Sequence, residues 1–154
     1  MNKVLGFSLI EVLIALLVLA LGLLGLAGLQ VTSLKNNLSA YNRSQATLLA
    51  YDLADRMRAN VAAATTYTST DPSKAIPQSA CTTAPGCSPQ NMAINDLFEW
   101  NSSLVSTGLS LVRGTITVTV NTVTGNIYSI EIIWDDDRDT ILNDHTYITS
   151  FQLE

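Results

Sequence analysis

Charge is nearly missing from the first part of this 154-residue sequence, where only Lys3 and Glu11 are charged before Lys35. The rest of the chain is acidic, and the net charge of the whole sequence is −5. Because an acidic chain repels phosphate, binding to nucleic acid through overall charge is excluded, and no direct nucleic-acid partner is predicted. There is one long apolar run, which excludes a transporter with several spans. The length suits one modest domain rather than two independent cores.

Histidine and cysteine are equally scarce, with one His and two Cys in the whole sequence. His145 stands alone, and there is no recognisable Ser/His/Asp grouping, P-loop or GxGxxG motif, so neither an enzyme nor a cofactor is predicted. Cys81 and Cys87 enclose five residues that include Pro85-Gly86, a pair that favours a turn. A CxxC redox motif has a different spacing, and a metal site would need two more ligands. We therefore expect a small structural disulfide formed in an oxidising compartment.

The apolar run covers residues 12–29, which carry no polar side chain, and Phe7, Leu9 and Ile10 extend it. Its length is that of a membrane-spanning helix, about 20 residues. The two candidate structures are a cleaved secretory signal and a retained membrane anchor. Glu11 favours the anchor, because a carboxylate inside a span costs about 2.5–3.5 kcal/mol and is usually functional. Lys3, ahead of the run, predicts a cytoplasmic N-terminus.

The start of the run contains the motif GFSLIE, from Gly6 to Glu11. This motif resembles the type III signal of type IV prepilins and pseudopilins, which a membrane peptidase cuts after the glycine and then methylates. The resemblance implies that residues 1–6 are a cytoplasmic leader peptide, that cleavage falls between Gly6 and Phe7, and that Phe7 becomes N-methylated. It also implies that Glu11 pairs with the Phe7 amine of a neighbouring subunit and sets the axial register. The alternative for Glu11 is snorkelling to the cytoplasmic headgroups.

Residues 30–60 contain no Gly or Pro and predict an amphipathic helix continuous with the anchor, from about Phe7 to Val61. Asp52 and Asp55 lie close enough to Arg56 and Arg58 to form surface pairs. We expect one apolar stripe of this helix to contact the domain's own sheet. The stripe consists of Val31, Leu34, Leu38, Tyr41, Leu48, Leu49, Leu53 and Met57.

The remaining elements are a loop over 62–89, a short helix and three strands. Ser88-Pro89 is typical of a helix start, and Gly108 marks its end. Within this helix Trp100 is interpreted as exposed, as a packing aromatic or as a subunit contact. Alternating patterns predict an antiparallel meander over residues 115–120, 127–134 and 147–153. The residues expected to face the helix are Ile116, Val118, Val120, Tyr128, Ile130, Ile132 and Trp134.

Together these elements predict an α+β fold, in which a long N-terminal α-helix with a membrane-spanning first half packs on a small antiparallel β-sheet. This architecture is similar to that of type IV pilins. The resemblance divides the chain into the leader at 1–6, a transmembrane or filament-core half of the helix at 7–29, and a periplasmic head at 30–154. The head comprises the amphipathic half of the helix, the disulfide loop and the sheet.

An acidic turn between the last two strands is the one candidate metal site. Asp135, Asp137 and Asp139 have the alternate spacing that begins an EF-hand loop. The sixth and twelfth positions are Thr140 and Thr146 instead of Gly and Glu, so the segment is not an EF-hand. A single Ca²⁺ held by the turn and a solvated charged hairpin both remain open.

The resemblance extends to the minor pilins of the type IV pilus. It implies a subunit of the priming or tip complex that starts pilus assembly and so supports adhesion, twitching motility and DNA uptake. The implied partners are the other minor pilins, the major pilin, the prepilin peptidase, the inner-membrane assembly platform and a tip adhesin. The implied location is the bacterial inner membrane, in a single pass with a periplasmic head, and then the pilus tip. The alternatives are a minor pseudopilin of a type II secretion system and a calcium-dependent binding module on a membrane stalk.

Overall fold

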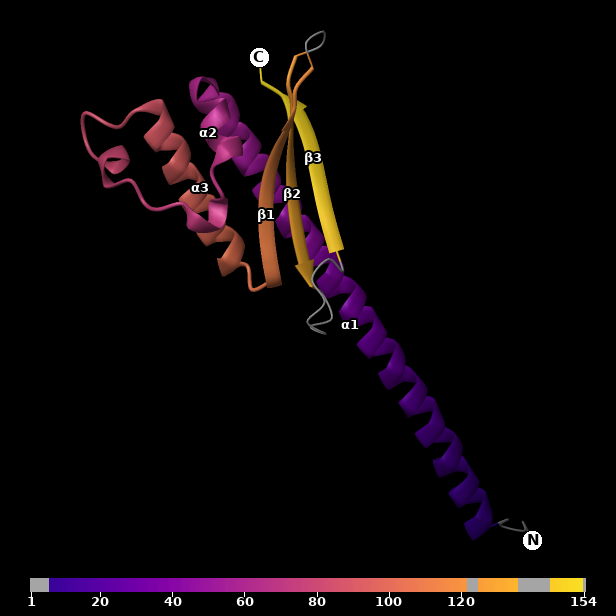
Figure 1. Ribbon diagram of the computed structural model, residues 1–154. Coiled ribbons are helices and arrows are strands. Elements are labelled where there is room, and N and C mark those ends of the chain that lie inside the picture. Colours follow the sequence, from indigo (N-terminus) through magenta and orange to yellow (C-terminus); the bar gives the residue numbers. More distant parts are fainter. Residues whose placement is uncertain (1–5, 122–124, 136–144, 154) are drawn as a thin grey trace. The chain divides into compact units, whose positions relative to one another are not determined.

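The computed structural model describes residues 6–121, 125–135 and 145–153. The chain forms two compact units, Met1–Ala40 and Tyr41–Glu154. The predicted boundary after residue 29 separates the transmembrane half of the helix from the periplasmic head. It depends on the membrane and stays a prediction. The helices are α1 (Leu9–Ala59), η1 (Val61–Ala63), α2 (Ala64–Ser69), η2 (Pro72–Lys74), η3 (Ser79–Thr82) and α3 (Pro89–Ser106), and the strands are β1 (Ser110–Thr119), β2 (Ile127–Asp135) and β3 (His145–Gln152) (Figure 1).

Among the described residues of the N-terminal unit, the helix begins at Leu9, two residues after the predicted start at Phe7. Ser8 begins the helix, because its Oγ accepts a hydrogen bond from the N–H of Ile10 at 3.3 Å. The Ser8 carbonyl accepts from the N–H of Glu11 at 3.0 Å. A side-chain cap of this kind satisfies a backbone donor that has no partner inside the helix. Phe7 therefore precedes the helix instead of opening it.

The C-terminal unit contains a three-stranded antiparallel sheet in the order β1-β2-β3, which confirms the predicted meander. On β2 the predicted inner face is correct: Tyr128, Ile130, Ile132 and Trp134 are all buried. On β1 the prediction holds only for Ile116. Val118 is exposed near the end of the strand, and Val120 is exposed beyond it.

The final part of α1, from Tyr41 to Ala59, packs on this sheet, but through a different stripe from the one predicted. Leu53 and Met57 are buried as expected. The other buried positions are alanines, which let the helix backbone approach its neighbours closely. They are Ala46, Ala50 and Ala54. The prediction was wrong for Val31, Leu34, Leu38, Tyr41 and Leu48, which are all more than half exposed.

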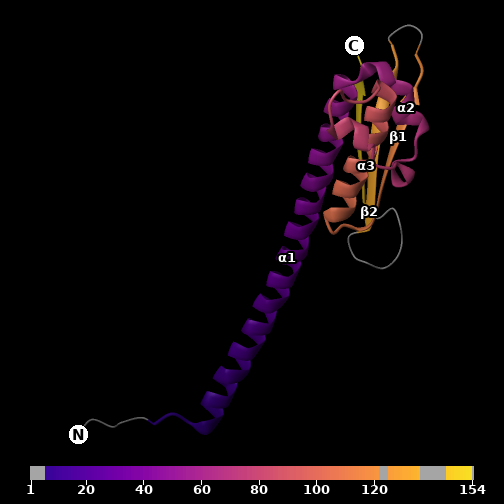
Figure 2. The same cartoon turned by 90° about the vertical axis from the view of Figure 1, so that its left-hand side faces the viewer.

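The helix α3 runs alongside β1 in both views (Figure 1, Figure 2). Its predicted start is confirmed, because Ser88 Oγ accepts from the N–H of Asn91 at 3.2 Å. Trp100 is fully buried, and its indole N–H donates to the carbonyl of Leu49 at 2.9 Å. It is therefore a packing aromatic, and neither an exposed side chain nor a subunit contact.

The segment expected as a loop, residues 62–89, is partly helical, because it contains α2, η2, η3 and the last two residues of η1. Cys81 and Cys87 form the predicted disulfide, with an S–S distance of 2.02 Å. The segment is also tied to α3, since the N–H of Gln78 donates to Asn95 Oδ1 at 2.9 Å. The disulfide and this hydrogen bond together hold the connection between α2 and α3 in place.

Candidate functional site

The predicted processing residues lie at the start of α1. Gly6 and Phe7 precede the helix, and the side chain of Phe7 is 85% exposed. Phe7 and Glu11 line one surface depression of about 490 Å³, whose other lining residues are Val12, Ala15, Leu16 and Leu19. The structure thus brings the predicted methylation residue and the predicted register residue to the same side of one helix end.

The Glu11 carboxylate has no hydrogen-bond or ion-pair partner within the part of the chain that the structure describes. It lies in the first turn of α1, where the helix dipole favours a negative charge. The dipole alone does not offset the cost of placing a carboxylate in an apolar span. Glu11 is therefore a candidate for pairing with a cation, and the described residues supply none.

Between Val12 and Leu29, α1 exposes apolar side chains around its whole circumference. It is long and apolar enough to cross a membrane by length and composition. Gly22, Gly25 and Gly28 lie within it, and a Cβ added at any of them would meet nothing within 4 Å. No contact inside the chain requires these glycines, although each lowers helix stability by about 1 kcal/mol relative to Ala. They leave room for the close approach of another helix.

The C-terminal unit contains a polar cluster around Arg56. Its Nε lies 3.1 Å from Asp52 Oδ2, and its Nη1 lies 3.2 Å from Asp96 Oδ1 and 2.8 Å from Glu99 Oε2. The hydroxyl of Tyr67 donates to the other oxygen of Asp96. Since these residues come from α1, α2 and α3, the cluster fastens the three helices to one another.

Only the ion pairs within α1 could be predicted from the sequence. The predicted pair of Arg56 with Asp52 is present, as is that of Arg58 with Asp55 at 2.7 Å. The contacts of Arg56 with α3 span 40 residues or more of sequence, and no local spacing signals them.

The charges of the cluster shift its pKa values in directions that stabilise the ion pairs. The hydrogen bond from Arg56 lowers the pKa of Glu99, although partial burial acts in the opposite direction. Burial acts to lower the pKa of Arg56, but the three carboxylates outweigh it and raise this pKa. Burial and the hydrogen bond to Asp96 raise the pKa of Tyr67. At neutral pH the phenol therefore stays a hydrogen-bond donor.

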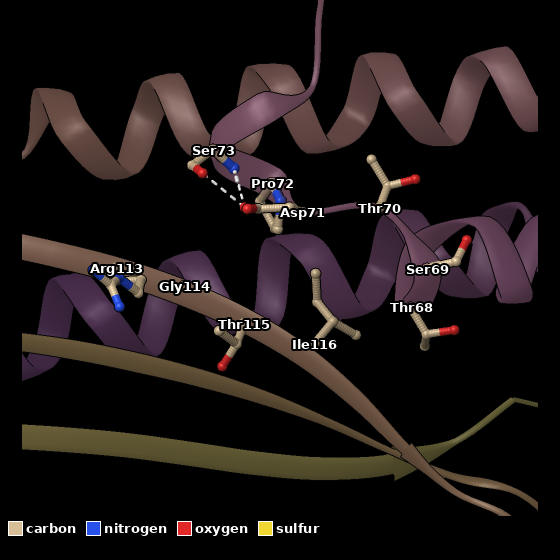
Figure 3. Close-up of a pocket in the computed structure, with 10 residues that line it drawn as sticks. All are labelled: Thr68, Ser69, Thr70, Asp71, Pro72, Ser73, Arg113, Gly114, Thr115 and Ile116. Atoms are coloured by element: carbon tan, nitrogen blue, oxygen red, sulfur yellow. Dashed lines mark hydrogen bonds between the residues drawn. The ribbon is translucent and has the colours of Figure 1, made fainter.

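A pocket of about 600 Å³ lies in the same unit, between β1 and the segment that joins α2 to η2 (Figure 3). It is lined by Thr68, Ser69, Thr70, Asp71, Pro72, Ser73, Arg113, Gly114, Thr115 and Ile116. Half of these ten residues carry a hydroxyl, and the pocket also contains one acidic and one basic residue. The sequence carried no signal for this pocket, because its two walls are about 40 residues apart in the chain.

The calcium candidate is only partly described. Asp135 is buried at the end of β2, whereas Asp137 and Asp139 lie outside the described residues. Within the described ranges no group of three or more His, Cys, Asp or Glu side chains could hold a metal ion. His145 stacks on Trp134, its register partner across β2 and β3, with ring centroids 5.7 Å apart.

A membrane-length apolar helix that continues onto a small antiparallel sheet defines the class of pilin-like subunits. Two family models match the chain: type IV pilin Tt1218 over residues 28–98, and the prokaryotic N-terminal methylation motif over residues 1–27. The chain therefore belongs to the type IV pilins. Proteins of this family are structural subunits that assemble with other pilins and are substrates of the prepilin peptidase. Neither the curated proteins nor the solved structures contain a match.

Proposed function

We propose that this type IV pilin is a minor pilin of the priming or tip complex, similar to the pilus modification protein PilV. In this role it helps to start pilus assembly and so supports adhesion, twitching motility and DNA uptake. The observation that carries the proposal is the start of α1, where Glu11 has no partner among the described residues and lies next to Phe7. In the proposed assembly, a neighbouring subunit supplies the cation that Glu11 lacks among the described residues.

The first step of the proposed function is processing. The prepilin peptidase removes residues 1–6 by cutting between Gly6 and Phe7, and then methylates the new amine of Phe7. The position of both residues ahead of the Ser8 cap supports this step, because a protease needs a backbone free of helical hydrogen bonds. Lys3 keeps the leader in the cytoplasm, so that residues 7–29 span the inner membrane and the head faces the periplasm.

The second step is entry into the filament. The amine of Phe7 in one subunit pairs with the Glu11 carboxylate of the next, which removes two unpaired charges from an apolar environment and sets the axial register. The exposed residues of α1 supply the apolar contacts, and the three glycines leave room for neighbouring helices. The partners are the other minor pilins, the major pilin, the assembly platform and a tip adhesin.

The test is Glu11→Ala, with Glu131→Ala on the sheet as the matched carboxylate control. We expect Glu11→Ala to be processed and folded, as shown by the Phe7 N-terminus and by circular dichroism. Its co-purification with the other minor pilins should fall at least tenfold, while Glu131→Ala retains it. Normal recovery of the complex with Glu11→Ala would contradict the register role.

A gene deletion distinguishes a subunit of a type IV pilus from a pseudopilin of a type II secretion system. Deletion of the gene should reduce surface fibres and leave secretion of extracellular enzymes intact. Loss of secreted enzymes with normal fibres would instead assign the chain to a type II secretion pseudopilus.

A further inference from the structure

The two edges of the sheet differ in how they are protected from other strands. In the order β1-β2-β3, the outer edges belong to β1 and β3. The edge of β1 is covered by α2 and η2, its register with β2 is irregular between Ser110 and Arg113, and it carries the charge of Arg113. A cover, a bulge and a charge are devices by which proteins keep an edge strand from pairing with another chain.

Strand β3 has none of these devices among the described residues. Apart from β2, no described helix or strand flanks it (Figure 1). Its pairing with β2 is regular from His145 to Gln152, without a bulge. Residues 146–151 include no charged residue, no Pro and no Gly. The edge of β3 is therefore a flat, uncharged template for another strand.

The backbone of β3 offers hydrogen-bonding groups along this edge. In an antiparallel pair, every second residue directs its N–H and C=O at the partner strand, and the residues between them direct theirs away from it. For residues 146–151, no backbone hydrogen bond outside the sheet is present within the described ranges. Every second one of these residues therefore presents a donor and an acceptor, at the two-residue repeat of an extended chain.

Ring contacts hold β3 in place at both ends. Phe151 stacks on Tyr128 with ring centroids 6.1 Å apart, and the guanidinium of Arg58 lies 5.0 Å from the centroid of the Phe151 ring. At the other end of the strand, His145 stacks on Trp134. A template that is fixed in this way loses little conformational freedom when a segment binds to it, which favours binding.

We propose that β3 binds an extended, uncharged segment of a partner protein, which adds to its edge as a further strand of the sheet. Backbone hydrogen bonds supply the affinity, and side-chain pairs across the strands supply the selectivity. On one face the segment meets Tyr147, Thr149 and Phe151, and on the other it meets Ile148, which is 59% exposed. A charge at the centre of the segment would lose water without gaining a partner on β3. The proposal goes beyond the proposed function and holds for a pilus and a secretion system alike.

The probes are capped, fluorescein-labelled heptapeptides, tested on the full chain in detergent micelles. The parent peptide alternates Thr with Val and has a central Tyr. Two further peptides carry Asp or Lys in place of the Tyr, and another is N-methylated at two adjacent central residues, which removes a donor from each of its edges. We expect the parent to bind at least tenfold tighter than the N-methylated peptide. It should also bind at least threefold tighter than both charged peptides, whereas attraction by net charge would favour one of them.

Amide hydrogen exchange locates the bound peptide. In the chain alone, every second amide over residues 146–151 should exchange rapidly. The parent peptide should slow the exchange of these amides at least tenfold and leave the amides of β1 unchanged. Ile148→Lys, which places a charge on this edge, should weaken binding at least fivefold. Thr117→Lys, at an exposed position on β1, is the matched control and should retain it.

Four results would overturn the proposal. They are the absence of binding by the parent peptide, equal binding of the N-methylated peptide, slowed exchange at sites other than β3, and retained affinity in Ile148→Lys. Slow exchange of the same amides in the chain alone, increasing with its concentration, would also overturn it and show that a second copy of the chain occupies the edge.

Discussion

At the scale of single residues, small side chains determine how closely the parts of the head approach one another. Gly114 on β1 lies directly against the ring of Trp100, and a Cβ at this position would overlap the ring. Trp100 has no room to move, because it is fully buried and its indole N–H is bound to Leu49. This glycine is therefore required by close packing and not by a special backbone conformation.

We predict that Gly114→Ala destabilises the head by about 1–3 kcal/mol, the usual range for overpacking a dense core. Thr117→Ala, at an exposed position on the same strand, is the control and should change stability by less than about 0.5 kcal/mol. Urea unfolding of the full chain in detergent, followed by tryptophan fluorescence, measures both. Equal stability of Gly114→Ala and wild type would show that the ring can move aside.

The cluster around Arg56 makes stability depend on pH. Because the pKa of Glu99 is lower in the folded chain than its ordinary value of 4.5, its contribution is present above that value. It is lost as the pH falls through the folded pKa. The side chain of Glu99 is 45% exposed, so the contribution is small, below about 1 kcal/mol.

We predict that Glu99→Gln loses less stability than wild type when the pH falls from 7 to 3. Arg56→Gln should have the same effect on this pH dependence, because it removes the principal cause of the shift. Melting temperatures at pH 7, 5, 4 and 3 provide the measurement. A pH response in Glu99→Gln identical to that of wild type would contradict the role of this pair.

At the scale of elements, α1 is the part of the fold that the sequence predicted best. Its length followed from an apolar run joined to a segment without Gly or Pro, and its start followed to within two residues. The buried face of α1 was predicted wrongly, because large apolar residues such as Leu34 and Leu48 are exposed while Ala46 and Ala50 are buried. Periodicity identifies a stripe but not its partner, and alanine contributes little to such a pattern. We infer that the exposed stripe contacts other subunits.

This interpretation of α1 leads to a prediction for its glycines. Gly25→Leu should insert into the membrane and be processed normally, because the added side chain meets nothing within its own chain. Its incorporation into fibres should fall several-fold, because the room for a neighbouring helix is lost. Leu24→Ile, which conserves volume, is the control. The ratio of protein in sheared fibres to protein in membranes is the readout, and an unchanged ratio for Gly25→Leu would exclude a packing role.

At the scale of the whole molecule, the two family matches and the fold support the assignment from different parts of the chain. The matches end at residue 98, whereas the sheet begins at Ser110. The strands were predictable because alternation is a local property. The Arg56 cluster and the pocket beside β1 were not, because each depends on residues about 40 positions apart. The motif residues Gly6, Phe7 and Glu11 could be named from the sequence, but the roles proposed for them involve other molecules.

Processing between Gly6 and Phe7 and entry into a surface filament together define the proposed function. Mass spectrometry of the N-terminal peptide, from membranes and from sheared surface fibres in parallel, tests it most directly. We expect a peptide that begins at N-methylated Phe7 in both samples. An intact Met1, or a first residue beyond Ala27 as after a secretory cleavage, would contradict it.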